Sequence, residues 1–207
     1  MKISCSNVGK RFNREWIFRN FNYEFNDSGS YAITGPNGSG KSTLLQVLAG
    51  SIISSEGKIE YHLKTGSKTI DVDSIYQHIA IAAPYVDVIE EMTLQEFFHF
   101  HQTFKPFLPG TTIREIISMI DLQKAADKQI RYYSSGMKQR VKLAQAIFSN
   151  TPYLFLDEPC TNFDETGLKL YQHLIEQYCN NRLVIVSSND EKEFAFCSQS
   201  LSVLDYK

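Results

Sequence analysis

The sequence predicts an α/β protein in which a parallel β-sheet is interrupted by a helical insertion and preceded by an antiparallel β layer. Three observations predict this fold class. Short segments of alternating apolar and polar residues fill the first thirty positions, which suits antiparallel strands. Apolar strands then alternate with helical segments, which is typical of a parallel sheet. The middle part of the 207-residue chain is helical throughout.

The expected elements follow in chain order from apolar periodicity and from glycine and proline breaks. Strands are expected at 3–6, 18–25, 31–33, 58–63, 79–83, 153–156 and 183–186. Helices are expected directly after residue 43, over 93–148 with breaks at Pro106 and Pro109, and at 165–179. A short helix and a final strand close the chain, and residues 66–74 are expected to form a surface connection.

The strongest motif lies at residues 35–43, GPNGSGKST, where the pattern G-x-x-x-x-G-K-[ST] is complete. Glycines let the backbone curl so that several N–H groups point at one anion. Lys41 adds a positive charge at the β- and γ-phosphates of a nucleotide, and the Ser42 hydroxyl can ligate Mg²⁺. The residues expected to bind the nucleotide here are Gly35, Asn37, Gly38, Ser39, Gly40, Lys41, Ser42 and Thr43.

A second motif is an apolar strand, residues 153–156, that runs directly into Asp157 and Glu158. Such a strand releases its acids at the carboxyl edge of the sheet, where α/β proteins bind ligands. Asp157 can hold Mg²⁺ directly or through water. Glu158 points differently and could accept a proton from an attacking water molecule.

Composition excludes several classes of protein. The net charge of −2 and the pI near 6.2 indicate no basic face for nucleic acid. No apolar run reaches eighteen residues, so the chain itself is not expected to span a membrane. The four cysteines lack metal-site spacing and are expected to be reduced thiols in a cytosolic protein.

The helical middle is rich in phenylalanine. Packing in the core is expected for most of these side chains, and the rest could form an apolar surface for a partner helix. They are Phe97, Phe98, Phe100, Phe104 and Phe107.

Over nearly its whole length the chain resembles an ATP-binding cassette (ABC) ATPase. GPNGSGKST matches the Walker A motif of that family, and YLFLDEP at 153–159 matches its Walker B segment with the catalytic glutamate. TNFD at 161–164 resembles the D-loop, which helps to build the dimer interface. The resemblance implies a P-loop NTPase (RecA-like) core with an antiparallel β subdomain and a helical insertion, and ATP and Mg²⁺ as ligands. It implies one domain over 1–207, with the core at 1–84 and 150–207 and the helical subdomain at 85–149.

The family signature maps onto residues 133–137, YSSGM, where three of five positions depart from the consensus. Ser134 and Gly136 keep the two positions that contact phosphate in the family. An apolar stripe follows the serines, which predicts an amphipathic helix whose N-terminal dipole can face an anion. Ser134 or Ser135 would cap that helix in any case, and the same geometry serves both purposes. Phe12 is expected to stack on adenine, with Trp16 as the alternative.

Two switch positions differ from the family pattern. Pro84 or Tyr85 stands where the glutamine of the Q-loop is expected. Asn189 stands in place of the switch histidine, and an asparagine amide can donate a hydrogen bond to a γ-phosphate but cannot carry a proton. The catalytic set implied by the resemblance is therefore Glu158, Asn189 and Lys41, with slowed hydrolysis.

The function implied by the resemblance is that of an ATPase subunit that powers a membrane transporter through ATP-dependent dimerisation. Its partners would be a second copy or a related ATPase subunit, and separate transmembrane subunits at the inner face of the cell membrane. One alternative is a soluble ABC ATPase of an assembly complex that does not transport. Another is a nucleotide-gated partner that hydrolyses ATP only weakly.

Overall fold

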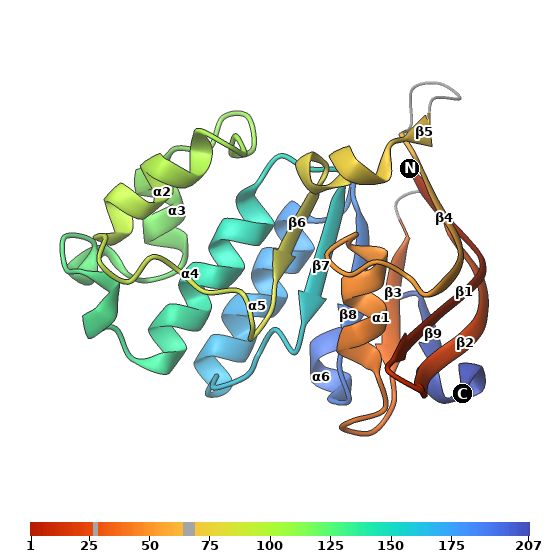
Figure 1. Ribbon diagram of the computed structural model, residues 1–207. Helices are drawn as coiled ribbons and strands as arrows, with labels where there is room; N and C mark the ends of the chain where they lie inside the picture. Colours follow the sequence, from red (N-terminus) through yellow and green to blue (C-terminus); the bar gives the residue numbers. More distant parts are fainter. Residues whose placement is uncertain (27–28, 64–68) are drawn as a thin grey trace.

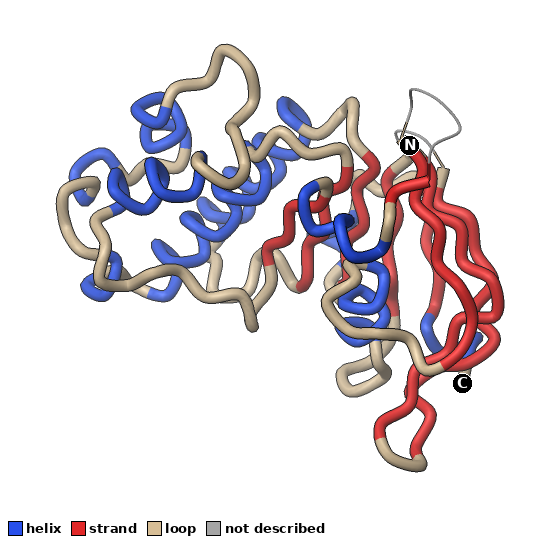
Figure 2. The backbone as a smooth tube through the Cα atoms, turned by 45° about the horizontal axis from the view of Figure 1, so that its top comes forward, coloured by secondary structure: helices blue, strands red, loops and turns tan. Residues whose placement is uncertain are grey.

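The computed structural model describes residues 1–26, 29–63 and 69–207. Figure 1 shows the strands of an antiparallel sheet at one end of the molecule, and helices α2 (Leu94–Gln102), α3 (Ile113–Met119) and α4 (Ser135–Phe148) toward the other. Figure 2 gives the same division from a second direction, with the parallel sheet between the two ends. The candidate site residues lie at the ends of strands of the parallel sheet and at the start of helix α4 beside it.

The first layer is an antiparallel sheet with the strand order β2-β1-β4-β5. Long alternating segments form it because every second side chain packs inward. Its strands are β1 (Lys2–Phe12), β2 (Glu15–Phe25), β4 (Glu56–His62) and β5 (Thr69–Ile70).

The second sheet has the order β6-β7-β8-β3-β9, and all of its pairs are parallel. The phosphate loop leaves β3 at the centre of the molecule, and the two acids leave β7 two strands away. The strands are β3 (Ser30–Thr34), β6 (Ile79–Ala82), β7 (Tyr153–Asp157), β8 (Leu183–Ser187) and β9 (Gln199–Ser202).

Neighbouring residues of β7 face two different cores. Tyr153 and Phe155 pack with α1 (Lys41–Leu48) and the antiparallel sheet, whereas Leu154 and Leu156 pack with the helical part. Successive side chains of a strand point to opposite faces, so a strand that is apolar at every position belongs between two packed layers. This explains why the strand shows no alternation of polar residues and why it can carry Asp157 to a buried position.

The helices follow the expected order, but the stretch expected to be helical over 93–148 has a further break, because residues 120–134 contain only two short 3₁₀ helices. Capping boxes begin two of them, with Thr93 bonded to Glu96 and Thr112 bonded to Glu115. The α-helices are α1 (Lys41–Leu48), α2 (Leu94–Gln102), α3 (Ile113–Met119), α4 (Ser135–Phe148), α5 (Glu165–Tyr178) and α6 (Glu191–Phe194). Short 3₁₀ helices are η1 (Val72–Gln77), η2 (Gln123–Ala125), η3 (Ile130–Tyr132) and η4 (Val203–Tyr206).

The surface connection expected at residues 66–74 contains regular structure in its described part. Residues 69–74 are not merely a surface connection, because Thr69 and Ile70 pair with β4 and η1 begins at Val72. The Asp71 carboxylate caps η1 by accepting a hydrogen bond from the Asp73 backbone. Residues 66–68 of that expected connection lie outside the described residues.

Candidate active site

The phosphate loop joins β3 to α1 and is held by its own side chains. Gly35 has φ of 145°, and a Cβ there would lie 2.7 Å from the Ser39 hydroxyl oxygen. Gly40 has φ of 103° and caps α1, and a Cβ there would collide with the Ile17 side chain. Both positions therefore need glycine, and the resulting curl leaves the start of α1 open to an anion.

Lys41 is 4% exposed, and its ammonium donates to the Gly35 carbonyl at 2.9 Å and the Pro36 carbonyl at 3.3 Å. Both of these acceptors are neutral carbonyl groups, so they do not neutralise the buried ammonium, which can still pair with an anion. The residues of this loop fit a phosphate, because backbone N–H groups and the Lys41 charge converge on the same cradle.

Asp157 lies at the end of β7 and is 1% exposed, and neither of its carboxylate oxygens has a hydrogen-bond partner that meets geometric criteria. Burial raises its pKa, while the nearby hydroxyls of Ser187 and Ser42 lower it, Glu158 raises it and Lys41 lowers it. The hydroxyl oxygens of Ser39 and Ser187 are likewise buried without partners. Buried oxygens left unpaired beside a phosphate loop fit a hard cation such as Mg²⁺.

Of Pro84 and Tyr85, the two candidates for the Q-loop position, Tyr85 is the residue that reaches the Asp157 carboxylate. β6 pairs with β7 so that Ala82 lies opposite Leu156, which brings the chain after β6 beside Asp157. The Tyr85 hydroxyl lies near Asp157 and Gln46, and its pKa is raised by burial first and by the Asp157 charge second. Pro84, the other candidate for this position, turns its carbonyl to the Lys142 ammonium at 3.2 Å.

Glu158 faces the phosphate loop. It lines a cavity of about 230 Å³ together with loop residues. The other lining residues are Ile17, Asn37, Gly38, Gly40, Lys41, Ser42 and Thr43. The Glu158 backbone has φ of 44°, which is uncommon for a residue with a side chain, and its N–H donates to the Ser187 carbonyl at 2.9 Å. A carboxylate beside the phosphate cradle is placed to take a proton from a water molecule there.

Asn189 follows β8 and reaches the same loop from another strand. Its side-chain amide nitrogen donates to the side-chain Oδ1 of Asn37 at 3.1 Å. Both residues are exposed, so the pair stands at the mouth of the phosphate loop. The structure thus brings Asn189, the adjacent acids Asp157 and Glu158, and Lys41 to one place from three separate segments.

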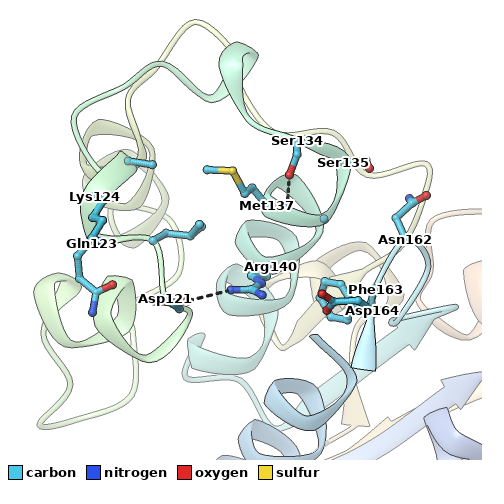
Figure 3. Close-up of a pocket in the computed structure, with 13 residues that line it drawn as sticks. Asp121, Gln123, Lys124, Ser134, Ser135, Met137, Arg140, Asn162, Phe163 and Asp164 are labelled. Atoms are coloured by element: carbon cyan, nitrogen blue, oxygen red, sulfur yellow. Dashed lines mark hydrogen bonds and ion pairs between the residues drawn. The ribbon is translucent and has the colours of Figure 1, made fainter. Parts of the chain in front are cut away.

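The residues Ser134 and Gly136 lie elsewhere. Ser134 caps α4 by accepting a hydrogen bond from the Met137 N–H at 3.3 Å. A Cβ on Gly136 would lie 3.3 Å from the Asn162 carbonyl oxygen. Figure 3 shows Ser134 and Asn162 beside a surface cavity of about 810 Å³, which Gly136, Asp164 and Arg140 also line. This cavity shares no lining residue with the cavity at the phosphate loop.

The two candidates for adenine stacking differ in their surroundings. Phe12 is 47% exposed at the end of β1, with the Lys10 ammonium 4.9 Å from its ring centroid. The Trp16 ring is partly buried and carries two guanidinium contacts, from Arg11 at 5.4 Å and from Arg19 at 4.5 Å. Neither ring lines the phosphate-loop cavity, whereas Ile17 does.

Sequence reasoning missed several residues of this site. Ile17 packs on the phosphate loop, and its place in an alternating strand was the one local signal for it. Gln139 and Glu193 bond to the backbone next to Glu158, at Pro159 and Cys160. Their contacts span 20 and 33 residues, and no pattern in the sequence marked them.

Three comparisons place this geometry among known proteins. A family model described as ABC transporter matches residues 18–161. The uncharacterised ABC transporter ATP-binding protein YxlF of Bacillus subtilis (strain 168) is 34% identical over 172 residues, which are 80% of this chain and 55% of that protein. The chain therefore spans about half the length of that relative.

Two solved structures share the fold. A putative ABC transporter ATP-binding protein from Pyrococcus furiosus has a TM-score of 0.82 at 19% identity, with 100% of both chains covered. The dimeric ATP-binding cassette MJ0796, in a post-hydrolysis state bound to ADP and Pi, has a TM-score of 0.79 at 24% identity. That match covers 97% of this chain and 93% of the cassette. The expected P-loop NTPase core with its antiparallel sheet and helical insertion is confirmed. In the described residues no helix is long and apolar enough to cross a membrane.

Proposed function

The chain belongs to the ABC transporter family as an ATP-binding subunit, and from this premise we propose that it hydrolyses ATP to power a membrane transporter. In this proposal ATP joins the chain to a second copy or to a related ATPase subunit. One observation carries it: the phosphate loop and Glu158 line one cavity, whereas Ser134 and Gly136 line another. A site divided in this way is completed by a second chain.

The exposure of Ser134 supports the pairing. Its hydroxyl is at the surface, at the N-terminus of the 14-residue helix α4, where a dipole favours a negative charge. The Asn162 carbonyl lies close to Gly136, so the segment 161–164 stands at the same surface. A cassette of similar fold whose structure is dimeric also supports the pairing of two chains.

The phosphate loop would hold the β- and γ-phosphates, and Ser42 and Asp157 would hold Mg²⁺. When bound, the cation supplies positive charge at the phosphate oxygens. Glu158 is the general base in the proposal, because it shares the loop cavity and can accept the proton of the attacking water. Asn189 donates a hydrogen bond toward the γ-phosphate in exchange for its present contact with Asn37.

Steady-state phosphate release by the full chain, alone and with its membrane partners, tests the proposal. Glu158→Gln should lower the rate by about 10²- to 10⁴-fold and should retain ATP as a stable dimer in a mass measurement in solution. Lys41→Ala should lose both hydrolysis and ATP-dependent pairing. An unchanged hydrolysis rate in Glu158→Gln would remove Glu158 from the mechanism.

A second candidate function is favoured by Asn189, which cannot carry a proton as a histidine does. In that case the chain is a nucleotide-gated partner that binds ATP and barely hydrolyses it. Phosphate release from the assembled complex separates the two candidates. A rate equal to that of Lys41→Ala, with ATP-dependent pairing intact, would support the gated partner.

A further inference from the structure

The peptide group between Pro159 and Cys160 is held from both sides by buried side chains. The Gln139 amide nitrogen donates to the Pro159 carbonyl at 2.7 Å. The Cys160 N–H donates to the Glu193 carboxylate at 2.7 Å. Gln139 is 6% exposed and Glu193 is 5% exposed. Both polar groups of one peptide are therefore paired with side chains instead of water.

The two side chains come from helix α4, which begins after Ser134, and from helix α6, which follows Asn189. Gln139 lies on α4, five residues after Ser134, and Glu193 lies on α6, four residues after Asn189. The buried Tyr171 hydroxyl donates to the Glu193 carbonyl at 2.7 Å and anchors that short helix to α5. A single peptide is thus tied to the helix that begins at Ser134 and to the segment that carries Asn189.

The groups around the Glu193 carboxylate also connect it to the site. The Ser188 hydroxyl lies next to this carboxylate, and the carboxylates of Asp190 and Glu158 lie close enough to repel its negative charge. The Ser188 oxygen accepts from the Asp190 N–H at 2.9 Å. The carboxylate therefore bridges the strand end that precedes Asn189 and the backbone that follows Glu158.

The held peptide follows a residue in an uncommon conformation. Glu158 has φ of 44°, and Asn162, at the other end of the segment, has φ of 68°. Left-handed backbone at a residue with a side chain is unfavourable and persists only where the surroundings impose it. Thr161 contributes by donating its N–H and its hydroxyl to the Glu158 carbonyl at 3.2 and 2.9 Å. Gln139 and Glu193 supply the bonds to the intervening peptide.

We infer that Gln139 and Glu193 are positioning residues that clamp the Pro159–Cys160 peptide, so that Glu158 faces the phosphate loop and residues 161–164 face the partner chain. This inference rests on the proposed function. A displacement of α4 or of the Asn189 segment pulls on this peptide, and the clamp thereby links the two halves of the divided site to the general base.

Four variants of the full chain test the clamp. Glu193→Ala removes the acceptor for the Cys160 N–H, whereas Glu193→Gln keeps an oxygen in the same place. Gln139→Glu replaces the donor to the Pro159 carbonyl with an acceptor at almost constant volume. Glu191→Ala is the matched control, because Glu191 is an exposed acid on the same helix.

Hydrogen exchange at the Cys160 amide and ATP hydrolysis are measured for each variant. Glu193→Ala should speed the exchange of that amide and lower kcat by about 10- to 100-fold. Gln139→Glu should lower kcat to a similar extent. Glu193→Gln should recover most of the activity, and Glu191→Ala should match the wild type. Affinity for ATP should stay within about twofold in all four, since the clamp does not contact the phosphate loop.

A double variant gives the sharpest outcome. If both side chains act through one peptide, the loss in Glu193→Ala with Gln139→Glu is clearly smaller than the product of the single losses. Multiplying losses, or single losses that appear only as a lower melting temperature with unchanged kcat, overturn the inference. If the wild type hydrolyses ATP and the folded variants hydrolyse it at the same rate, the clamp is refuted but the proposed function is not. A wild-type chain that binds no ATP refutes the proposed function instead.

Discussion

The Asn189 amide nitrogen donates to the Asn37 side-chain oxygen at 3.1 Å, across 152 residues of chain. This contact joins the end of β8 to the phosphate loop that follows β3, and the two strands are adjacent in the parallel sheet. It places an asparagine where the family pattern has a histidine. In the proposed mechanism Asn189 would therefore donate a hydrogen bond to a γ-phosphate held by that loop, but its amide cannot exchange a proton with it.

Replacing Asn189 with histidine should speed hydrolysis. An imidazole in this position can donate to the γ-phosphate and can also carry charge, so we expect a several-fold higher kcat in the full chain. The pH profile of kcat should gain a new limb near about 6.5, the ordinary pKa of histidine. Asn189→Ala is the control and should fall below the wild type, because it has no donor. Equal rates in all three proteins would show that this position does not act on the phosphate.

Removing the Tyr85 hydroxyl should weaken the response to Mg²⁺. The hydroxyl lies near the unpaired Asp157 carboxylate, so Tyr85→Phe should raise the Mg²⁺ concentration for half-maximal hydrolysis by about threefold or more, as expected for a lost neighbour of a metal ligand. Affinity for ATP without Mg²⁺ should not change. Tyr76→Phe, at an exposed tyrosine on η1, is the matched control. The same Mg²⁺ dependence in both variants would contradict a role for Tyr85.

Neutralising Asp157 should stabilise the nucleotide-free protein at neutral pH. Burial raises the pKa of Asp157, so the stability tied to its protonated form is complete below the unfolded value of about 3.9 and is lost as pH rises through the folded value. At pH 7 the wild type bears this cost and Asp157→Asn does not. The melting temperature of the variant should rise by about 2–4 °C for each kcal/mol recovered.

The pH dependence of that gain is the check. The difference in melting temperature should shrink as the pH falls through the raised folded pKa of Asp157, because the wild-type carboxyl then becomes protonated. Glu176→Gln, an exposed acid on α5, should show no such trend. A lower melting temperature for Asp157→Asn at pH 7 would show that its neighbours outweigh burial. Hydrolysis should be lost in either case.

A charge at Phe104 should impair assembly with membrane subunits. Phe104 is 71% exposed and lies 5.1 Å from the Phe100 ring, so the pair forms a small aromatic surface at the end of α2. Phe104→Glu should reduce recovery of the chain with its membrane partners by about tenfold, as expected for a lost aromatic anchor. ATP affinity should be unchanged. Ile53→Glu, at an apolar residue that is 85% exposed in the other part of the molecule, should assemble normally.

Much of the site could be predicted because its motifs are contiguous. The glycines, Lys41 and Ser42 of the phosphate loop all lie within residues 35–42, and the two acids directly follow one apolar strand. The elements flanking these motifs were also predicted, since strand and helix periods are local properties. The expected strands at 153–156 and 183–186 each differ from β7 and β8 by a single residue at the C-terminal end.

The altered switch segment shows where local reasoning stopped. The sequence left Pro84 and Tyr85 as equal candidates, because no rule of spacing separates adjacent residues after a strand. The parallel register of β6 with β7 brings the chain after β6 beside Asp157, and of the two residues Tyr85 is the one whose hydroxyl lies near that carboxylate. Phenylalanines of the helical part divide in the same way: Phe97, Phe98 and Phe107 are buried, whereas Phe100 and Phe104 are exposed.

The sequence by itself determined which chemical groups this protein carries, because a phosphate loop and an acidic strand end are specified by short spacings along the backbone. Only the tertiary structure decided which of those groups meet. Asn189 reaches Asn37, and Gln139 and Glu193 reach one peptide beside Glu158, through contacts between distant segments. Such contacts depend on strand order and helix packing, which are set by burial of the whole apolar surface rather than by any local pattern.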